Sequence, residues 1–92
     1  MLTDEQIADL RAACERIMWK AATGMWGVCI DGPLEGLKVR IDENTCKRPG
    51  AVWCLCLPVD RCLVVTEYTH APEPGHWRFR GYNYPGRRES SG

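Results

Sequence analysis

The N-terminal part of the chain has apolar residues at every third or fourth position, the spacing of one face of an α-helix. The members of this stripe are Ile7, Leu10, Cys14, Ile17, Met18 and Ala21. Thr3, followed three positions later by Gln6, is a capping-box sequence and predicts that the helix begins there. Gly24 suits the position just after a helix end. The pattern predicts an amphipathic helix over residues 3–23.

Beyond Gly24 the apolar residues follow the period of two that is typical of β-strands. The alternation predicts strands near residues 26–30, 37–41, 51–57, 62–69 and 77–80. The segment 51–57 is apolar on both faces, which is typical of a central strand. Residues rich in Gly, Pro and polar side chains predict turns or loops at 31–36, 43–50, 58–61 and 70–76.

These elements predict an α+β fold in which one N-terminal amphipathic helix packs on a four- to five-stranded antiparallel sheet. No helix is predicted between two strands, and parallel neighbours need a long crossover connection, so we expect no parallel pairing. Residues 1–84 are expected to form a single domain, and residues 85–92 a flexible C-terminal tail.

Composition narrows the class of protein. The chain has 92 residues, 45% of them hydrophobic, and its 12 Lys and Arg balance 12 Asp and Glu. This length excludes a two-domain enzyme, and the charge balance excludes a uniformly basic nucleic-acid coat. The acidic N-terminus lacks the apolar run of a signal peptide, and the uncharged stretch 21–30 is too short to cross a bilayer. We expect a soluble cytoplasmic protein with no membrane partner and leave its oligomeric state open.

The unusual part of the composition is six cysteines, at Cys14, Cys29, Cys46, Cys54, Cys56 and Cys62. Cys14 falls in the apolar stripe of the predicted helix, and Cys54 and Cys56 leave one strand on the same face. Structural zinc sites use two closely spaced ligand pairs, of which this spacing supplies one. We expect reduced, mostly buried thiols and neither a metal nor another cofactor, with a metal site, a disulfide or a reactive thiol as the alternatives.

The chain carries no recognisable catalytic motif. Its two histidines, His70 and His76, lie in one Pro- and Gly-rich loop. A nucleophile paired with a base is left open for Cys62 and His70, because nothing in the pattern selects or excludes it. We therefore expect no catalytic residues and no enzymatic activity, and keep a Cys/His metal or thiol enzyme as the least favoured class.

Basic and aromatic residues gather near the C-terminus and at two earlier places. If Trp77 and Phe79 face the core, Arg78 and Arg80 stand together on the open face of their strand. Arginine binds phosphates and carboxylates, and exposed tyrosine stacks on bases. The predicted contact residues are Arg78, Arg80, Arg87, Arg88, Lys38, Arg40, Lys47, Arg48, Tyr82 and Tyr84. The alternative is an edge strand whose arginines only suppress aggregation.

Trp19 is a further candidate contact residue. At 100° per residue it falls opposite the apolar stripe, among Ala8, Ala12, Glu15 and Arg16. A large aromatic residue on a polar face is either an anchor for a partner or is covered by the chain's own loops.

A chain of this size that starts at its own methionine, with one helix, a short antiparallel sheet and an Arg/aromatic segment at 77–88, resembles the small accessory proteins of bacterial viruses, and within them the anti-CRISPR inhibitors. The resemblance covers the whole chain in size and architecture but includes no sequence motif, so no family site residue is carried over. It implies non-enzymatic blockade of a CRISPR surveillance complex in the bacterial host cell, by contacts with protein subunits and guide RNA.

Two other classes stay open beside this binding or inhibitor protein. A small nucleic-acid-binding domain would bind nucleic acid directly, with a steep dependence on salt. A subunit of a larger cellular complex cannot be told from an inhibitor by sequence. The partner we expect is thus a protein or a protein–RNA complex, with direct nucleic-acid contact as part of the alternative.

Overall fold

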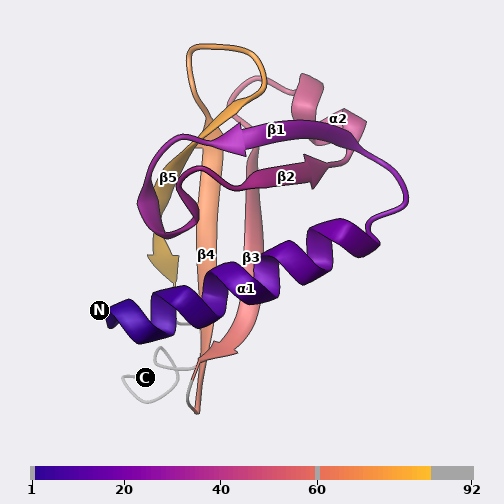
Figure 1. Cartoon of the computed structure of the whole chain (residues 1–92). Coiled ribbons are helices and arrows are strands. Elements are labelled where there is room, and N and C mark those ends of the chain that lie inside the picture. The colour runs from indigo at the N-terminus through magenta and orange to yellow at the C-terminus, as the bar shows by residue number, and fades with distance from the viewer. Residues whose placement is uncertain (1, 60, 84–92) are drawn as a thin grey trace, which may run out of the picture.

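The computed structural model describes residues 2–59 and 61–83, with the side chains of Val59 and Cys62 left out of the description. The elements are α1 (Asp4–Lys20), β1 (Met25–Cys29), a 3-10 turn η1 (Gly32–Leu34), β2 (Lys38–Ile41), α2 (Glu43–Lys47), β3 (Val52–Val59), β4 (Cys62–His70) and β5 (His76–Asn83) (Figure 1). The predicted α+β fold is confirmed. The predicted tail and three predicted contact residues, Tyr84, Arg87 and Arg88, lie outside the described residues.

The five strands form one sheet in the order β2-β1-β5-β4-β3. The other neighbouring strands pair antiparallel as predicted, but β1 and β5 run parallel, with Val28 opposite His76 and Cys29 opposite Trp77. The expectation of a purely antiparallel sheet was wrong at this pair. Parallel neighbours need a long return connection, and here the whole segment from η1 to β4 supplies it in place of a helix.

The sheet curves so far that it is nearly closed like a barrel, and α1 lies against the opening (Figure 1). The two edge strands are β2 and β3, and α1 packs against both. The prediction that residues 51–57 form a central strand was therefore wrong, because β3 is an edge whose inner face is covered by the core and by α1. The idea that the arginine-bearing strand is an edge was also wrong, since β5 lies between β1 and β4.

Helix α1 begins as predicted, with a complete capping box between Thr3 and Gln6. It ends at Lys20, three residues earlier than predicted, because Ala21 is already extended and Arg40 donates hydrogen bonds to the carbonyls of Ala21 and Gly24 at 2.8 and 3.3 Å. A cation at the C-terminal end of a helix also matches the helix dipole.

The predicted loop at 43–50 contains the short helix α2. Its N-cap is Asp42, whose carboxylate accepts hydrogen bonds from the Thr45 hydroxyl at 2.6 Å and the Thr45 amide at 3.1 Å. These bonds lower the pKa of Asp42 below its usual value. Asp, Asn and Thr favour such caps, so the signal for this helix was present in the sequence but was interpreted as loop composition.

The core lies between α1 and the inner face of the sheet. Its largest contacts are aromatic: the rings of Trp53 and Tyr68 stack at 5.2 Å, and Trp77 meets Trp53 edge-on at 6.1 Å. From α1 the core takes Leu10, Cys14 and Met18, whereas Ile17 of the predicted stripe is 43% exposed. Neither described helix is long and apolar enough to cross a membrane.

The turn η1 covers the core beside Tyr68. The Tyr68 hydroxyl donates to the Asp31 carbonyl at 2.8 Å and accepts from the Leu34 amide at 2.9 Å. Arg11 of α1 reaches the same segment and donates to the carbonyls of Pro33 and Glu35 at 3.0 and 2.8 Å. These long-range bonds fix the connection between β1 and β2 against both the helix and the sheet.

Candidate binding surface

Trp19 and Trp26 project from the surface, where α1 ends and β1 begins. Trp19 is 84% exposed and Trp26 is 52% exposed. Trp19 lies on the helix face opposite the core, as the 100° periodicity predicts, and no described part of the chain covers it. The two indoles line one open hollow of about 610 Å³ together with Lys38 of β2.

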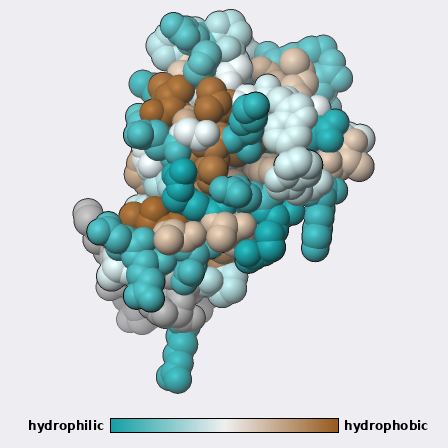
Figure 2. Space-filling view, viewed as in Figure 1, coloured by the Kyte–Doolittle hydropathy of each residue, from teal (hydrophilic) through white to brown (hydrophobic). Residues whose placement is uncertain are grey.

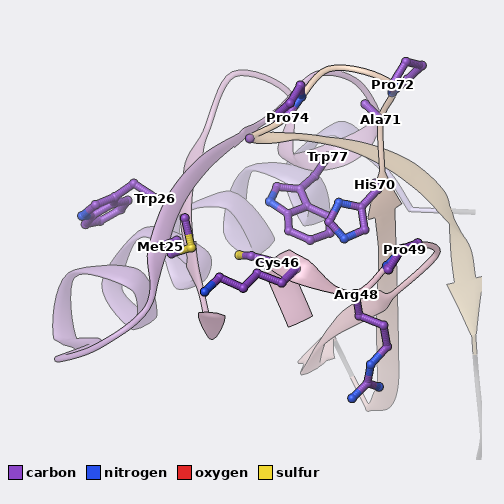
Figure 3. A pocket seen from close by; sticks show the side chains of 12 residues that line it. Met25, Trp26, Cys46, Arg48, Pro49, His70, Ala71, Pro72, Pro74 and Trp77 are labelled. Carbon is purple, nitrogen blue, oxygen red and sulfur yellow. The ribbon is translucent and has the colours of Figure 1, made fainter. Parts of the chain in front are cut away.

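Trp26 stands where three adjoining hollows meet. The first, of about 350 Å³, lies between β1, α2 and the 71–75 loop (Figure 3). The second is the hollow shared with Trp19, and the third, of about 320 Å³, extends along α1 past Trp19 and Lys38. We call the three together the Trp26 groove; its indole and basic side chains are Trp19, Trp26, Trp77, Lys38, Lys47 and Arg48.

Arg40 connects the two segments that carry the exposed tryptophans. Its guanidinium carbon lies 5.5 Å from the centroid of the Trp26 ring, and the same group bonds the backbone carbonyls that follow α1. The helix end that carries Trp19 is thereby tied to Trp26. Arg40 was predicted as a contact residue; its Nε and Nη1 groups are already bonded within the chain, so the role that the structure gives it is to position the groove.

The first hollow has an aromatic wall. The His70 ring lies 4.4 Å from Trp77, and its Nε2 is 3.1 Å from the Thr45 carbonyl (Figure 3). Lys47 also lines this hollow and pairs with Glu43 on the preceding turn. The Arg48 side chain runs away from Trp77 at the rim (Figure 3). Lys38, Lys47 and Arg48, three of the predicted contact residues, are thus brought to one groove with Trp19.

The predicted contact residues of β5 lie elsewhere. Trp77 is buried and both Arg78 and Arg80 are exposed, as the alternation predicts. Neither arginine lines the Trp26 groove, because both follow His76 along β5 away from it. A β-bulge opposite Glu67 and Tyr68 shifts the alternation, so the half-buried Tyr82 ring packs on Phe79 at 5.0 Å instead of standing beside the arginines.

Sequence reasoning missed Trp26 because the alternation in β1 does not say which face of the strand is buried. In the structure Trp26 and Ile30 are exposed, while Cys29 is buried. Gly27 faces inward, where an added Cβ would lie 2.8 Å from Nε1 of Trp77. Only glycine lets β1 pass this close to the indole, and an isolated glycine within a strand pattern was the available signal.

Hydrophobic and hydrophilic residues are mixed on the face formed by α1, β1 and β2. Figure 2 shows hydrophilic side chains spread over this face, with patches of hydrophobic residues between them. Such a face, carrying large exposed aromatic side chains beside lysines, has the composition of interface anchors surrounded by a polar rim.

Four of the described cysteines have raised pKa values. Burial raises the pKa of Cys14 to about 11 and that of Cys29 to about 12, and partial desolvation raises the pKa of Cys46 and Cys54. Thiols of this kind stay protonated and are weak nucleophiles. No cluster of three or more His, Cys, Asp or Glu residues suited to a metal occurs within residues 2–59 and 61–83.

One expectation about the cysteines was wrong, and one alternative that had been left open does not fit the fold. Cys54 and Cys56 are exposed on the outer face of β3, so the thiols are not mostly buried. Cys62 and His70 stand at the two ends of β4, eight residues apart, and a strand rises about 3.3 Å per residue. The pairing of a Cys62 nucleophile with a His70 base is therefore excluded.

The buried thiols predict a loss of stability at alkaline pH. Cys14 and Cys29 have raised pKa values in the fold, so they contribute stability that is fully present below their usual pKa of 9.0 and is lost as pH rises toward 11 and 12. Within this window each thiol should lower the free energy of unfolding by about 1.4 kcal/mol per pH unit.

Urea unfolding at a series of pH values measures this slope. Above pH 9 the free energy of unfolding of the double variant Cys14→Ala, Cys29→Ala should fall less steeply with pH than that of the wild type. The core packing lost in the variant lowers its stability by the same amount at every pH, so it does not change this slope. Equal slopes for the two proteins would contradict the conclusion that Cys14 and Cys29 cause the loss of stability at alkaline pH.

A comparison of the chain with protein-family models, with curated proteins and with solved structures finds no match.

Proposed function

We propose that this chain is a non-enzymatic binding protein that inhibits its partner by occupying the partner's surface. The contact is made through the Trp26 groove, and the partner is a protein–RNA complex of the bacterial cytoplasm. In keeping with the resemblance in size and architecture to anti-CRISPR inhibitors, the complex we name is a CRISPR surveillance complex, which the bound protein prevents from engaging target DNA.

The observation that carries the proposal is the exposure of two tryptophans in one hollow. A solvent-exposed indole is costly for an isolated domain, and tryptophan is among the residues most enriched at interface hot spots. Trp19 and Trp26 are 84% and 52% exposed and share their hollow with Lys38. Arg40 fixes the position of the Trp26 ring, so little conformational entropy is lost when a partner binds.

The chemistry of the described side chains supports binding rather than catalysis. The pKa values of Cys14, Cys29, Cys46 and Cys54 are raised. His70 stacks on Trp77 and has its Nε2 next to a backbone carbonyl. A catalytic site needs a nucleophile held near a base, and among the described residues no hydrogen bond joins any of these thiols to His70.

Trp19→Ala is expected to weaken binding to the purified surveillance complex by about 30-fold, the loss of one interface hot spot. The measurement is the inhibitor concentration that halves binding of target DNA by the complex. Ile17→Ala is the matched control, because Ile17 is an exposed apolar residue of the same helix that lies outside the groove. It should change the value by less than about threefold.

The arginines of β5 provide the competing surface. If the double variant Arg78→Glu, Arg80→Glu loses inhibition while Trp19→Ala retains it, the contact lies on β5 and the groove is the wrong surface. If the wild-type protein leaves DNA binding of every tested surveillance complex unchanged, the inhibitor proposal is wrong, and a subunit of another cellular complex becomes the favoured class.

A further inference from the structure

We infer that the Trp26 groove binds a single-stranded segment of nucleic acid, with bases stacked on the indoles and phosphates held by the basic side chains. This inference rests on the proposed function, because it names the part of the partner complex that the groove receives. It also leaves the arginines of β5, which the sequence had grouped with the basic residues of the groove, outside the nucleic-acid contact.

The groove combines indole and basic side chains. Trp26, Lys47 and Arg48 line the first hollow, where Trp77 is a buried wall, 2% exposed, that offers no ring face to a base. The second and third hollows pair Trp19 and Trp26 with Lys38. Proteins that bind single strands combine aromatic side chains, on which successive bases stack, with cations that follow the backbone. A series of connected hollows fits a strand better than a single compact ligand.

The charge around the groove favours an anion. Lys38 makes no ion pair with any described residue, and neither does Arg48. Lys47 is paired with Glu43. Among the described residues that line the three hollows the sole acidic side chain is Glu15, in the third. The groove therefore has an excess of positive charge although the whole chain is neutral, and the excess lies beside the exposed indoles.

The ring of Trp26 is already held in place. Arg40 lies 5.5 Å from the ring centroid, and the Arg40 side chain is itself bonded to two backbone carbonyls. A ring fixed in this way needs no reordering when a base stacks on it. The first hollow, of about 350 Å³, lies within the range of about 300–1,000 Å³ for small-molecule sites and so has room for one base.

The inference predicts binding of isolated single strands in the absence of any partner protein. The probe is a fluorescein-labelled oligouridine RNA of about a dozen nucleotides, the length that one small single-strand-binding domain covers. Fluorescence anisotropy measures its affinity, and quenching of intrinsic tryptophan emission reports stacking. With Lys38 and Arg48 neutralising about two phosphates, the logarithm of the affinity should fall with a slope of about −1.4 against the logarithm of the salt concentration.

Variants inside and outside the groove separate this site from general electrostatics. Trp26→Ala should weaken RNA binding about tenfold, the loss of one stacked base, and Lys38→Glu should weaken it and flatten the salt dependence. Arg78→Glu is the matched control, because Arg78 is exposed on β5 outside the groove and loses its charge in a similar way. This variant should leave the affinity within about twofold of the wild type. Far-UV circular dichroism and the thermal midpoint show whether each variant is folded.

The outcomes distinguish this inference from the proposed function. Absence of RNA binding at low salt, or equal losses in Lys38→Glu and Arg78→Glu, overturns the inference, and so does tighter binding of duplex than of single-stranded RNA. If the protein still inhibits the surveillance complex under such a result, the groove binds a protein subunit. If RNA binds through the groove and no inhibition is seen, the inference stands and the proposed function fails.

Discussion

Replacing Tyr68 by Phe is expected to lower the free energy of unfolding by about 3 kcal/mol, because one hydroxyl satisfies two backbone groups in a buried place. The hydroxyl donates to the Asp31 carbonyl and accepts from the Leu34 amide. The side chain has no solvent exposure, so water cannot replace either bond. The ring and its stacking on Trp53 at 5.2 Å are retained in phenylalanine, and the loss therefore reports the hydroxyl alone.

A second hydroxyl on the same strand provides the control. Thr66 is also fully buried, but its Oγ1 has no hydrogen-bond partner among the described residues. Thr66→Val keeps the shape and removes an unsatisfied polar group, so it should be neutral or stabilising. Chemical denaturation of the three proteins measures both effects. Equal losses in Tyr68→Phe and Thr66→Val would show that the bonds to the η1 segment are not what stabilises this region.

Replacing Gly32 by Ala is expected to cost about 3 kcal/mol or more, since the new methyl group has no space and the backbone is unfavourable for alanine. Gly32 has a φ of +74°, and a Cβ there would overlap Cβ of Phe79 and lie 2.8 Å from the Tyr68 hydroxyl. The turn would have to move away from the sheet, and the bonds of Tyr68 would lengthen or break with it.

Gly36→Ala separates steric overlap from backbone strain. Gly36 has a similar φ of +82°, but no atom lies within 4 Å of the position that a Cβ would take. Its substitution should cost only the backbone strain, about 1–2 kcal/mol. Thermal and urea unfolding of both variants give the comparison. If Gly32→Ala is no more destabilising than Gly36→Ala, then the close packing of η1 against Phe79 contributes nothing measurable.

The elements that local sequence signals specify were predicted well. The capping box of Thr3 and Gln6 placed the start of α1 correctly, because the bonds that form it lie within one helical turn. The helical period placed Leu10, Cys14 and Met18 in the core and Trp19 outside it. The end of α1 was less predictable, since the groups that bond it belong to Arg40, which is distant in the chain.

The arrangement of strands depended on information that no short window contains. The alternation in β1 gave the correct period but not the buried face, because the inner face is set by the approach of Gly27 to the Trp77 indole. The apolar segment of β3 suggested a central strand, whereas α1 covers this edge of the sheet. The parallel pairing of β1 with β5 joins two segments that lie far apart in the chain, so no local pattern indicates it.

For the candidate contact residues, too, the sequence identified the single residues and the fold decided which of them meet. The sequence identified Trp19, Lys38, Lys47 and Arg48 one by one, from local charge and periodicity. It also grouped Arg78 and Arg80, and both are exposed as predicted. That the first set lines one groove around Trp26, apart from the arginines of β5, follows from the sheet order and from the seating of α2 beside β1.

The sequence by itself determined the fold class, the helix and its cap, the approximate positions of the strands and the place of Trp19 on the helix face opposite the core. These properties depend on side-chain spacing and on interactions between residues within a few positions of one another. The tertiary structure alone decided which face of β1 is buried, which strands form the edges and which aromatic and basic residues meet. Those outcomes depend on contacts between distant segments, such as Gly27 with Trp77 and Arg40 with Ala21. Patterns within a short stretch of sequence do not reveal such contacts.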